Sequence, residues 1–280
     1  MDLHIFLAVL LAAVLHASWN LLVKLDLDRF LALLLISCVM GIMGTVMLIV
    51  FSLPAMASAP YVVVSGLLHT GYNMFLARSY RTGDLSQVYP IARGTAPLLT
   101  FIGAWALAGE TVAGLGALGI LLLVCGIWLT ARPGAQAIRI DGMTLFFALG
   151  TSGFIAAYTI VDGFGARLSG SASAYAGMLF LLDALFMITA ALLTRGPGAF
   201  VRILPSWKNG TAGAMLSAGA YWIVIWAMSL APIAAVAALR ETSILFVMAM
   251  SALVLKERVT GLRLLGATLI VLGAVALRMS

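Results

Sequence analysis

Ten apolar segments, each about 20 residues long, follow one another along this chain with short connections between them. A segment of about this length is what an α-helix needs to cross the hydrocarbon core of a bilayer. With 63% hydrophobic and 9% charged residues, the chain could not solvate so much apolar surface as a soluble protein. We therefore expect an all-α integral membrane protein whose ten transmembrane helices span 3–23, 30–52, 61–80, 86–108, 112–131, 142–161, 171–193, 210–230, 232–255 and 260–278.

The positive net charge of +6 does not indicate a nucleic-acid partner, because the basic residues fall singly in short loops and not on one face. Membrane proteins favour Lys and Arg in cytoplasmic loops, and this bias explains the excess. Cys38 and Cys125 lie inside apolar runs, which argues against a disulfide framework. The expected partners are the lipid bilayer and a small-molecule substrate, and the expected location is the cell (inner) membrane. A monomer is compatible with the sequence.

Two distant stretches of the chain are diverged copies of one another, 93–132 and 240–279. Six identities mark the alignment at an offset of 147 residues: Arg93 with Arg240, Thr95 with Thr242, Glu110 with Glu257, Gly114 with Gly261, Gly119 with Gly266 and Gly126 with Gly273. A weaker echo places Asn20, Lys24 and Arg29 opposite Tyr158, Asp162 and Arg167.

The offset gives each half five helices, and five is odd, so the halves must cross the membrane in opposite senses. We expect an inverted repeat around a central cavity, as in many secondary transporters. The first repeat is 1–132, the inter-repeat loop 133–141 and the second repeat 142–280.

Two stretches carry a family resemblance. One reads His-Ala-Ser-Trp-Asn-Leu-Leu-Val-Lys from His16 to Lys24, and the other reads Arg-Glu-Thr-Ser-Ile-Leu-Phe from Arg240 to Phe246. The second is followed by Lys-Glu-Arg at 256–258 and by a helix with glycines at 266 and 273. These stretches resemble the opening helix and closing hairpin of the drug/metabolite transporter superfamily, in its EamA branch.

The resemblance implies a ten-helix carrier of small organic solutes that works by alternating access. We expect an amino-acid exporter, with the aromatic amino-acid exporters among the candidates, although the Tyr-x-Trp-Pro pattern of some of these reads Gly-Thr-Ala-Pro at 94–97. Two alternatives stay open. One is a translocator of lipid-linked sugars or nucleotide conjugates, and the other is a non-transporting structural or channel-like membrane protein.

Charged residues within the apolar segments are the first candidates for the site, because an ionisable group at membrane depth faces protein or a water-filled cavity. Arg93 and Arg240 are expected to contact an anionic group of the substrate, or else to form a structural ion pair with Asp183 or Glu241. Glu241 follows Arg240 directly, so Arg93 is the arginine expected to be available for substrate. Asp183 is the lone charge of its segment and is either a proton-coupling carboxylate or a structural partner of an arginine.

Aromatic and polar side chains widen the candidate set, because Tyr and Trp offer an apolar face with one hydrogen-bonding atom. The substrate-binding candidates of this kind are Trp19, Asn20, His69, Tyr72, Tyr89, Tyr158 and Trp222. The same residue types also form belts at membrane interfaces and pack helices together. Asn73, Tyr221 and Trp226 belong to the wider set.

Several patterns are structural rather than catalytic. Glu110 and Glu257 lie in short turns before helices, where an acid complements the helix dipole. The Gly-x-Gly-x-x-Gly pattern at 114–119 lacks the strand that a dinucleotide fold requires, and its glycines instead suit close helix packing. The Gly-Thr-Ser-Gly run at 150–153 is too short to indicate an intramembrane protease.

The sequence predicts no catalytic residues, no metal ligands, no cofactor and no ATPase domain, so the chain is not expected to be an enzyme. Most basic loop residues lie on the side opposite the two termini, which places the termini outside by the positive-inside rule. The family resemblance implies cytoplasmic termini instead. We favour the charge count, because the N-terminal tail carries no Lys or Arg.

Overall fold

The computed structural model describes the backbone of residues 1–22, 29–82, 85–112, 114–130, 141–254 and 260–280, and every regular element in these ranges is helical. The side chains at 20–22, 29, 80–82, 85–87, 89–90, 251 and 253–254 also lie outside the described part. The first half contains α1 Leu3–Leu22, α2 Arg29–Phe51, the 3-10 turn η1 Met56–Ser58, α3 Ala59–Thr82, α4 Leu85–Ala108 and α5 Leu115–Thr130.

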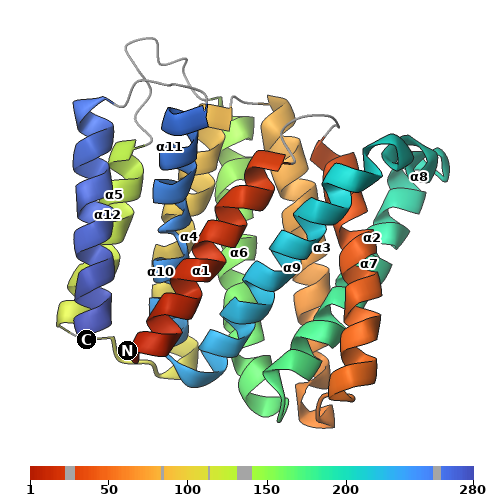
Figure 1. The fold of residues 1–280 in the computed structure, drawn as a ribbon, viewed down its shortest axis with the longest axis horizontal. Coiled ribbons are helices and arrows are strands. Elements are labelled where there is room, and N and C mark those ends of the chain that lie inside the picture. Colours follow the sequence, from red (N-terminus) through yellow and green to blue (C-terminus); the bar gives the residue numbers. More distant parts are fainter. Residues whose placement is uncertain (23–28, 83–84, 113, 131–140, 255–259) are drawn as a thin grey trace.

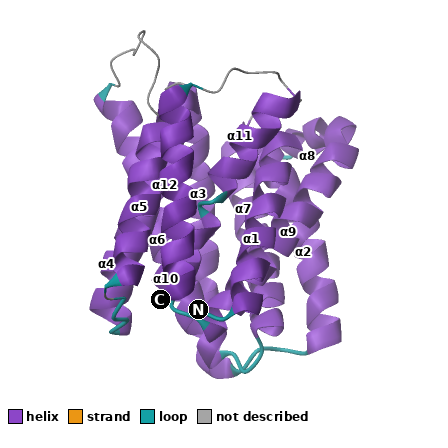
Figure 2. Ribbon diagram, turned by 60° about the vertical axis from the view of Figure 1, so that its left-hand side comes forward, coloured by secondary structure: helices purple, strands orange, loops and turns teal. Residues whose placement is uncertain are grey.

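The second half contains α6 Gly142–Leu168, α7 Ala172–Arg195, α8 Gly198–Ile203, the 3-10 turn η2 Leu204–Ser206, α9 Trp207–Leu230, α10 Ile233–Arg240, α11 Ser243–Val254 and α12 Gly261–Met279. The long helices stand side by side, and both termini lie at the same end of the bundle (Figures 1 and 2). Arg278 donates a hydrogen bond of 2.6 Å to the carbonyl oxygen of Met1 and so ties the two termini together.

The helices confirm the predicted all-α fold, and the largest differences from the predicted spans are the following. The sixth helix runs to Leu168, seven residues beyond the predicted end at 161. The ninth span is broken into α10 and α11. The stretch from Arg195 to Asn209, predicted as a loop, contains α8 and η2, and α9 begins inside it.

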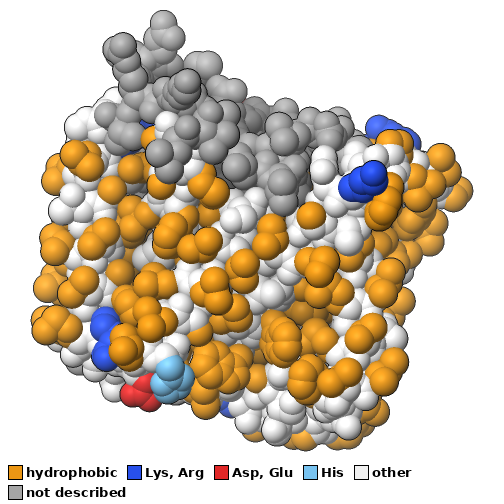
Figure 3. Space-filling view, viewed as in Figure 1, with side chains coloured by type: hydrophobic (Ala, Val, Ile, Leu, Met, Phe, Trp, Pro, Cys, Tyr) orange, Lys and Arg blue, Asp and Glu red, His pale blue; other side chains and the backbone are white. Residues whose placement is uncertain are grey.

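Length and composition make seven helical stretches of the described residues able to cross a membrane: Phe30–Phe51, Ile91–Ala108, Gly142–Leu168, Ala172–Arg195, Gly198–Leu230, Ile233–Met250 and Gly261–Met279. Two shorter apolar helices, Leu3–Trp19 and Leu115–Thr130, accompany them. Large apolar side chains cover the flank of the bundle between its two ends (Figure 3). Such a surface is stable in contact with lipid and not with water.

Glycines allow a close backbone contact between α5 and α12. A Cβ atom at Gly126 would lie 2.6 Å from the backbone oxygen of Gly266, and one at Gly119 would lie 2.8 Å from the backbone oxygen of Gly273. Only glycine lets the two backbones approach this closely, which is how small residues drive helix association in membranes. Gly116 and Gly119 of the 114–119 pattern are buried in α5, in agreement with the predicted packing role, whereas Gly114 precedes the helix and has nothing within 4 Å of an added Cβ.

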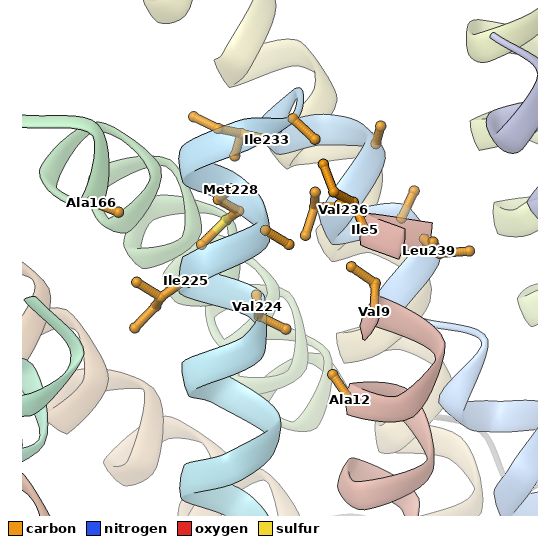
Figure 4. Packing of buried hydrophobic residues seen from close by; sticks show 14 of the residues in the cluster. Ile5, Val9, Ala12, Ala166, Val224, Ile225, Met228, Ile233, Val236 and Leu239 are labelled. Atoms are coloured by element: carbon orange, nitrogen blue, oxygen red, sulfur yellow. The ribbon is translucent and has the colours of Figure 1, made fainter. Parts of the chain in front are cut away.

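A single apolar cluster joins the two halves beneath the break in the ninth span. Val224, Ile225 and Met228 of α9 pack with Ile233 and other residues of α10 and with α1 (Figure 4). All four named side chains are at most 1% exposed. This core fixes α10 against α9 and α1, and so positions the charged residues at the end of α10.

The N-terminus of α6 is stabilised by a side-chain cap. Asp141 is the N-cap residue, and its two carboxylate oxygens accept hydrogen bonds of 2.8 Å from the backbone and the hydroxyl of Thr144. These hydrogen bonds hold the pKa of Asp141 below its usual range. The cap satisfies an amide that the first helical turn cannot pair internally.

Candidate functional site

The break between α10 and α11 brings two charged side chains to the middle of the ninth span. The helix gives way to a tight turn in which the amides of Glu241 and Thr242 donate to the carbonyls of Ala238 and Leu239. The Thr242 hydroxyl also donates to Leu239. The turn interrupts the α-helical hydrogen bonds after Arg240. Arg240 and Glu241 are buried at this turn, with exposed fractions of 4% and 1%.

Three charged residues meet at this break, and we refer to Arg93, Arg240 and Glu241 as the arginine cluster. Nε of Arg93 in α4 lies 2.9 Å from Oε2 of Glu241. Nε of Arg240 lies 3.8 Å from Oε1 of the same carboxylate. Because two guanidiniums share one carboxylate, the arginine cluster carries an excess positive charge in a buried environment.

The pairing reverses one expectation drawn from the sequence. We expected Arg240 to be the structural partner of Glu241 and Arg93 to be available for a substrate. In the structure Arg93 forms the close ion pair with Glu241, at 2.9 Å, whereas Nε of Arg240 lies 3.8 Å from the same carboxylate. Adjacent residues on a helix diverge, so Glu241 points to the neighbouring helix more directly than to Arg240.

Four ring side chains lie beside the arginine cluster, and we call His69, Tyr72, Tyr158 and Tyr221 the aromatic cluster. The ring of His69 stacks on that of Tyr158 with centroids 4.0 Å apart. Tyr72 and Tyr221 each meet Tyr158 edge-on, at 5.8 and 6.0 Å. Thus α3, α6 and α9 contribute rings to one place, and three of these rings, those of His69, Tyr72 and Tyr158, are among the candidates from the sequence.

The two clusters touch through Arg240. Its guanidinium carbon lies 6.0 Å from the ring centroid of Tyr221, which is cation–π distance. Arg240 also interacts with the Tyr158 side chain. Arg240 therefore has the ring faces and hydroxyls of the aromatic cluster on one side and Glu241 on the other.

A carboxylate that the sequence did not single out completes this region. Asp162 of α6 is fully buried and accepts hydrogen bonds from the hydroxyls of Tyr175 and Tyr221. Its Tyr175 contact is 2.9 Å long. The predicted helix ended at 161, one residue short, so Asp162 was left outside the span. The weak echo between the first and sixth helices was the signal that could have found it.

Asp183 of α7 is buried. Its Oδ2 accepts a hydrogen bond of 3.0 Å from the Ser37 hydroxyl of α2, while its Oδ1 has no hydrogen-bond partner. The sequence offered an arginine as a structural partner. Among the described contacts the partner is Ser37.

Both tryptophan candidates lie apart from the two clusters. Nε1 of Trp222 donates to Ser173 at 3.0 Å, and its ring meets Phe51 near the end of α2. Trp222 was expected deep in the pocket, but the neighbouring Tyr221 occupies that position, because adjacent helical residues point in different directions. Trp19 is buried in the apolar core and donates to His16 at 3.2 Å. The predicted site residues Asn20 and Tyr89 lie outside the described side chains.

Glu110 acts at a helix N-terminus, as predicted, but on a helix of the other half. Its carboxylate accepts from the amides of Ile233 and Ala234 at the start of α10, at 3.1 and 3.4 Å. It also pairs with Arg167 at 2.7 Å, and Arg167 donates to two carbonyls at the end of α9, those of Met228 and Ala231. These interactions of Glu110 and Arg167 fix the turn between α9 and α10. Glu257, its repeat equivalent, lies outside the described residues.

The remaining motifs have packing roles. Ser152 of the 150–153 run is fully buried, and its hydroxyl donates to the Ala92 carbonyl of α4 at 3.0 Å. It joins two helices, which is not the environment of a nucleophile. Among the described residues no group of three or more His, Cys, Asp or Glu side chains could hold a metal ion.

Comparisons with known proteins support the interpretation of this chain as a membrane transporter. One solved structure, described as "Crystal structure of protein", shares 14% sequence identity with a TM-score of 0.75, covering 99% of this chain and 96% of the other. At this identity the likeness shows the fold alone. No curated protein matches the chain. Residues 142–279 match the model of the EamA-like transporter family. The second half of the chain is therefore similar to the EamA-like transporter family.

Proposed function

We propose that this chain is a secondary transporter of the cell membrane that carries small organic solutes with an anionic group, amino acids first among them. The observation that carries the proposal is the arginine cluster. Two guanidiniums at 4% exposure face one carboxylate. Burying an excess charge at membrane depth is costly, and a substrate carboxylate would neutralise it.

Arg240 is the arginine best placed for that role. Arg93 has its close partner in Glu241, whereas Arg240 sits 3.8 Å from it. Arg240 also borders the aromatic cluster, so a substrate carboxylate bound there would place the rest of the molecule against ring faces. Such surfaces bind an amphipathic solute through both apolar contact and hydroxyl groups.

The position of Asp162 favours an amino acid over a simple anion. Its carboxylate is joined to Arg240 through Tyr221, which donates to Asp162 and lies under the guanidinium. A site with a positive pole at Arg240 and a negative pole at Asp162 matches a zwitterion. A nucleotide or lipid diphosphate would instead require more cations than the arginine cluster provides.

Alternating access between two inverted five-helix halves is the mechanism that we propose, and the helix contacts support it. Contacts occur in exchanged pairs: α3 packs on α6 while α1 packs on α9, and α3 packs on α7 while α2 packs on α9. The glycine contacts follow the same exchange at the offset of 147 residues, since Gly119 meets Gly273 and Gly126 meets Gly266. A two-fold axis relating the halves would produce both patterns.

The test is counterflow of labelled amino acids into liposomes that contain the purified protein. Arg240→Ala is expected to reduce uptake at least about 10-fold, which corresponds to about 1.4 kcal/mol of lost binding. Arg202→Ala, in the exposed surface of α8, is the matched control and should leave uptake unchanged. Exchange of a phosphorylated solute without exchange of any amino acid would refute the amino-acid proposal.

A further inference from the structure

A buried hydroxyl group without a partner stands at the start of α11. Among the fully buried hydroxyls of the described side chains, those of Thr159 and Ser243 have no hydrogen-bond partner. Ser243 is 0% exposed and follows Arg240 by three residues. An unpaired hydroxyl in the interior is costly, so its presence next to a buried charge indicates a donor for something that the protein itself does not supply.

The usual acceptor for this hydroxyl is already occupied. A serine hydroxyl in a helix commonly donates to the backbone oxygen four residues before it, which for Ser243 is that of Leu239. The Leu239 oxygen accepts from the amide of Thr242 at 3.0 Å and from the Thr242 hydroxyl at 2.8 Å. A carbonyl oxygen has two lone pairs, so no acceptor position is left there for Ser243.

The geometry of the break places Ser243 on the same face of the chain as Arg240. Within the stretch 241–245, four amides each donate to the carbonyl three residues before, which is 3-10 geometry. A 3-10 turn contains three residues, so side chains at positions i and i+3 eclipse one another. Arg240 and Ser243 therefore share one face, and Glu241 points to a different one.

The face of Arg240 and Ser243 is the one directed at the aromatic cluster. The Arg240 guanidinium carbon lies 6.0 Å from the ring centroid of Tyr221. The other faces of the break have other neighbours: Glu241 is directed at α4 by its ion pair, and Leu239 belongs to the apolar core that includes α1 (Figure 4). The unpaired hydroxyl thus lies on the side of the break where a cation and aromatic rings meet.

We infer that this side of the α10–α11 break is the carboxylate subsite of the transporter, with the Arg240 guanidinium and the Ser243 hydroxyl as its donors. Ser243 is then a specificity-determining residue. The inference rests on the proposed function and adds a neutral donor to the charge of Arg240. A guanidinium and a hydroxyl can donate to the two oxygens of one carboxylate. The positive end of the α11 dipole also lies at Ser243 and favours an anion there.

The two copies of the repeat differ at the positions that make this subsite. At the offset of 147 residues, Arg-Gly-Thr-Ala at 93–96 aligns with Arg-Glu-Thr-Ser at 240–243. The first copy lies within the unbroken helix α4, and its Ala96 belongs to one apolar cluster with Tyr158. The second copy has a carboxylate that pairs with the arginine of the first, and a hydroxyl on the face of its own arginine. Both differences make the second copy the one suited to bind an anion.

The stability of the ligand-free protein separates a binding role of Ser243 from a structural one. Ser243→Ala removes an unpaired hydroxyl, so the melting temperature in detergent micelles should stay the same or rise. Ser152→Ala is the comparison, because it removes a buried hydroxyl that donates to the Ala92 carbonyl at 3.0 Å, and it should lower the melting temperature. An equal decrease for Ser243→Ala would show that its hydroxyl is a structural donor and would overturn the inference.

Binding is measured by calorimetric titration of the purified protein with benzoate, a carboxylate on an aromatic ring, and with benzamide, its uncharged counterpart. The wild type should prefer benzoate. Ser243→Ala should weaken benzoate binding about 10-fold, which corresponds to about 1.4 kcal/mol, and Arg240→Ala should remove the preference for benzoate. Thr189→Ala changes an exposed hydroxyl of α7 and is the matched control, with no expected change. Equal benzoate affinity in the wild type and Ser243→Ala, or no benzoate binding by the wild type, overturns the inference.

Counterflow in liposomes distinguishes failure of this inference from failure of the proposed function. Ser243→Ala should raise the KM for an exchanged amino acid and leave the maximal rate within about twofold, because it removes one donor to the bound carboxylate. Amino-acid exchange with an unchanged KM would support the proposed function and overturn the subsite. Benzoate binding that depends on Ser243, without exchange of any amino acid, would support the subsite and refute amino-acid transport.

Discussion

Arg93 of α4 and Glu241 at the α10–α11 break form an ion pair of 2.9 Å that joins the two halves of the protein at membrane depth. The two residues are 4% and 1% exposed. In this position an ion pair is weak evidence for net stability, but removal of one partner leaves an uncompensated buried charge. The pair therefore holds α4 to the break only while both charges are present.

Glu241→Gln is expected to destabilise the protein by about 3–5 kcal/mol, because it leaves Arg93 and Arg240 without a counter-charge. Thermal unfolding in detergent micelles measures this loss. The double variant with Arg93→Met should be less destabilised than the sum of the single variants. Additive losses would show that the two side chains do not interact.

Tyr221→Phe removes one of two hydroxyl donors from the buried Asp162 carboxylate. We expect a loss of about 1–3 kcal/mol of stability, since an unsatisfied buried acceptor is costly. We also expect the transport KM to rise, because the lost hydroxyl holds Asp162 next to the ring that lies beside Arg240. Trp222→Phe, one residue on and outside both clusters, is the control, and an equal rise in KM there would contradict the assignment.

Gly126→Ala should destabilise the pairing of α5 with α12, since its Cβ would lie 2.6 Å from the backbone oxygen of Gly266. Backbone atoms cannot move aside as a flexible side chain can, so a loss of about 1–3 kcal/mol is expected. Gly153→Ala in α6 is the control, because nothing lies within 4 Å of its added Cβ. That control should be neutral or stabilising by up to about 1 kcal/mol, because Ala favours helix more than Gly does. Equal melting temperatures for both variants would count against the close α5–α12 contact.

We expect Glu110 and Arg167 to contribute to stability cooperatively. Glu110→Ala removes the ion pair and the acceptor for two amides of α10, and Arg167→Ala removes donors to two carbonyls of α9. A double-mutant cycle on unfolding should give a coupling of about 1 kcal/mol, moderated because Arg167 is 34% exposed. Coupling near zero would show that the two residues fix the α9–α10 turn independently.

The sequence alone located three of the rings of the aromatic cluster and all three members of the arginine cluster, because ionisable and aromatic residues are conspicuous within apolar runs. The sequence could not show which of these side chains contact one another. Trp222 and Tyr221 are adjacent in sequence, and only the rotation of α9 against α3 and α6 decides that Tyr221 faces His69. Likewise Asp162 was missed, because an apolarity criterion ends a helix at the first charge, whereas in the structure two tyrosine hydroxyls satisfy that charge inside the bundle.

Composition and the lengths of the apolar segments determined that this chain is a helical membrane protein, because a bilayer accepts few other arrangements of so many apolar residues. The family resemblance followed from local stretches in the same way. Tertiary structure decided which charges neutralise one another, and it chose Arg93 over the sequence neighbour Arg240 as the partner of Glu241. The physical reason is that ion pairing at membrane depth depends on distances of a few ångströms between helices, and these are set by packing of α4 against α10 and not by order along the chain.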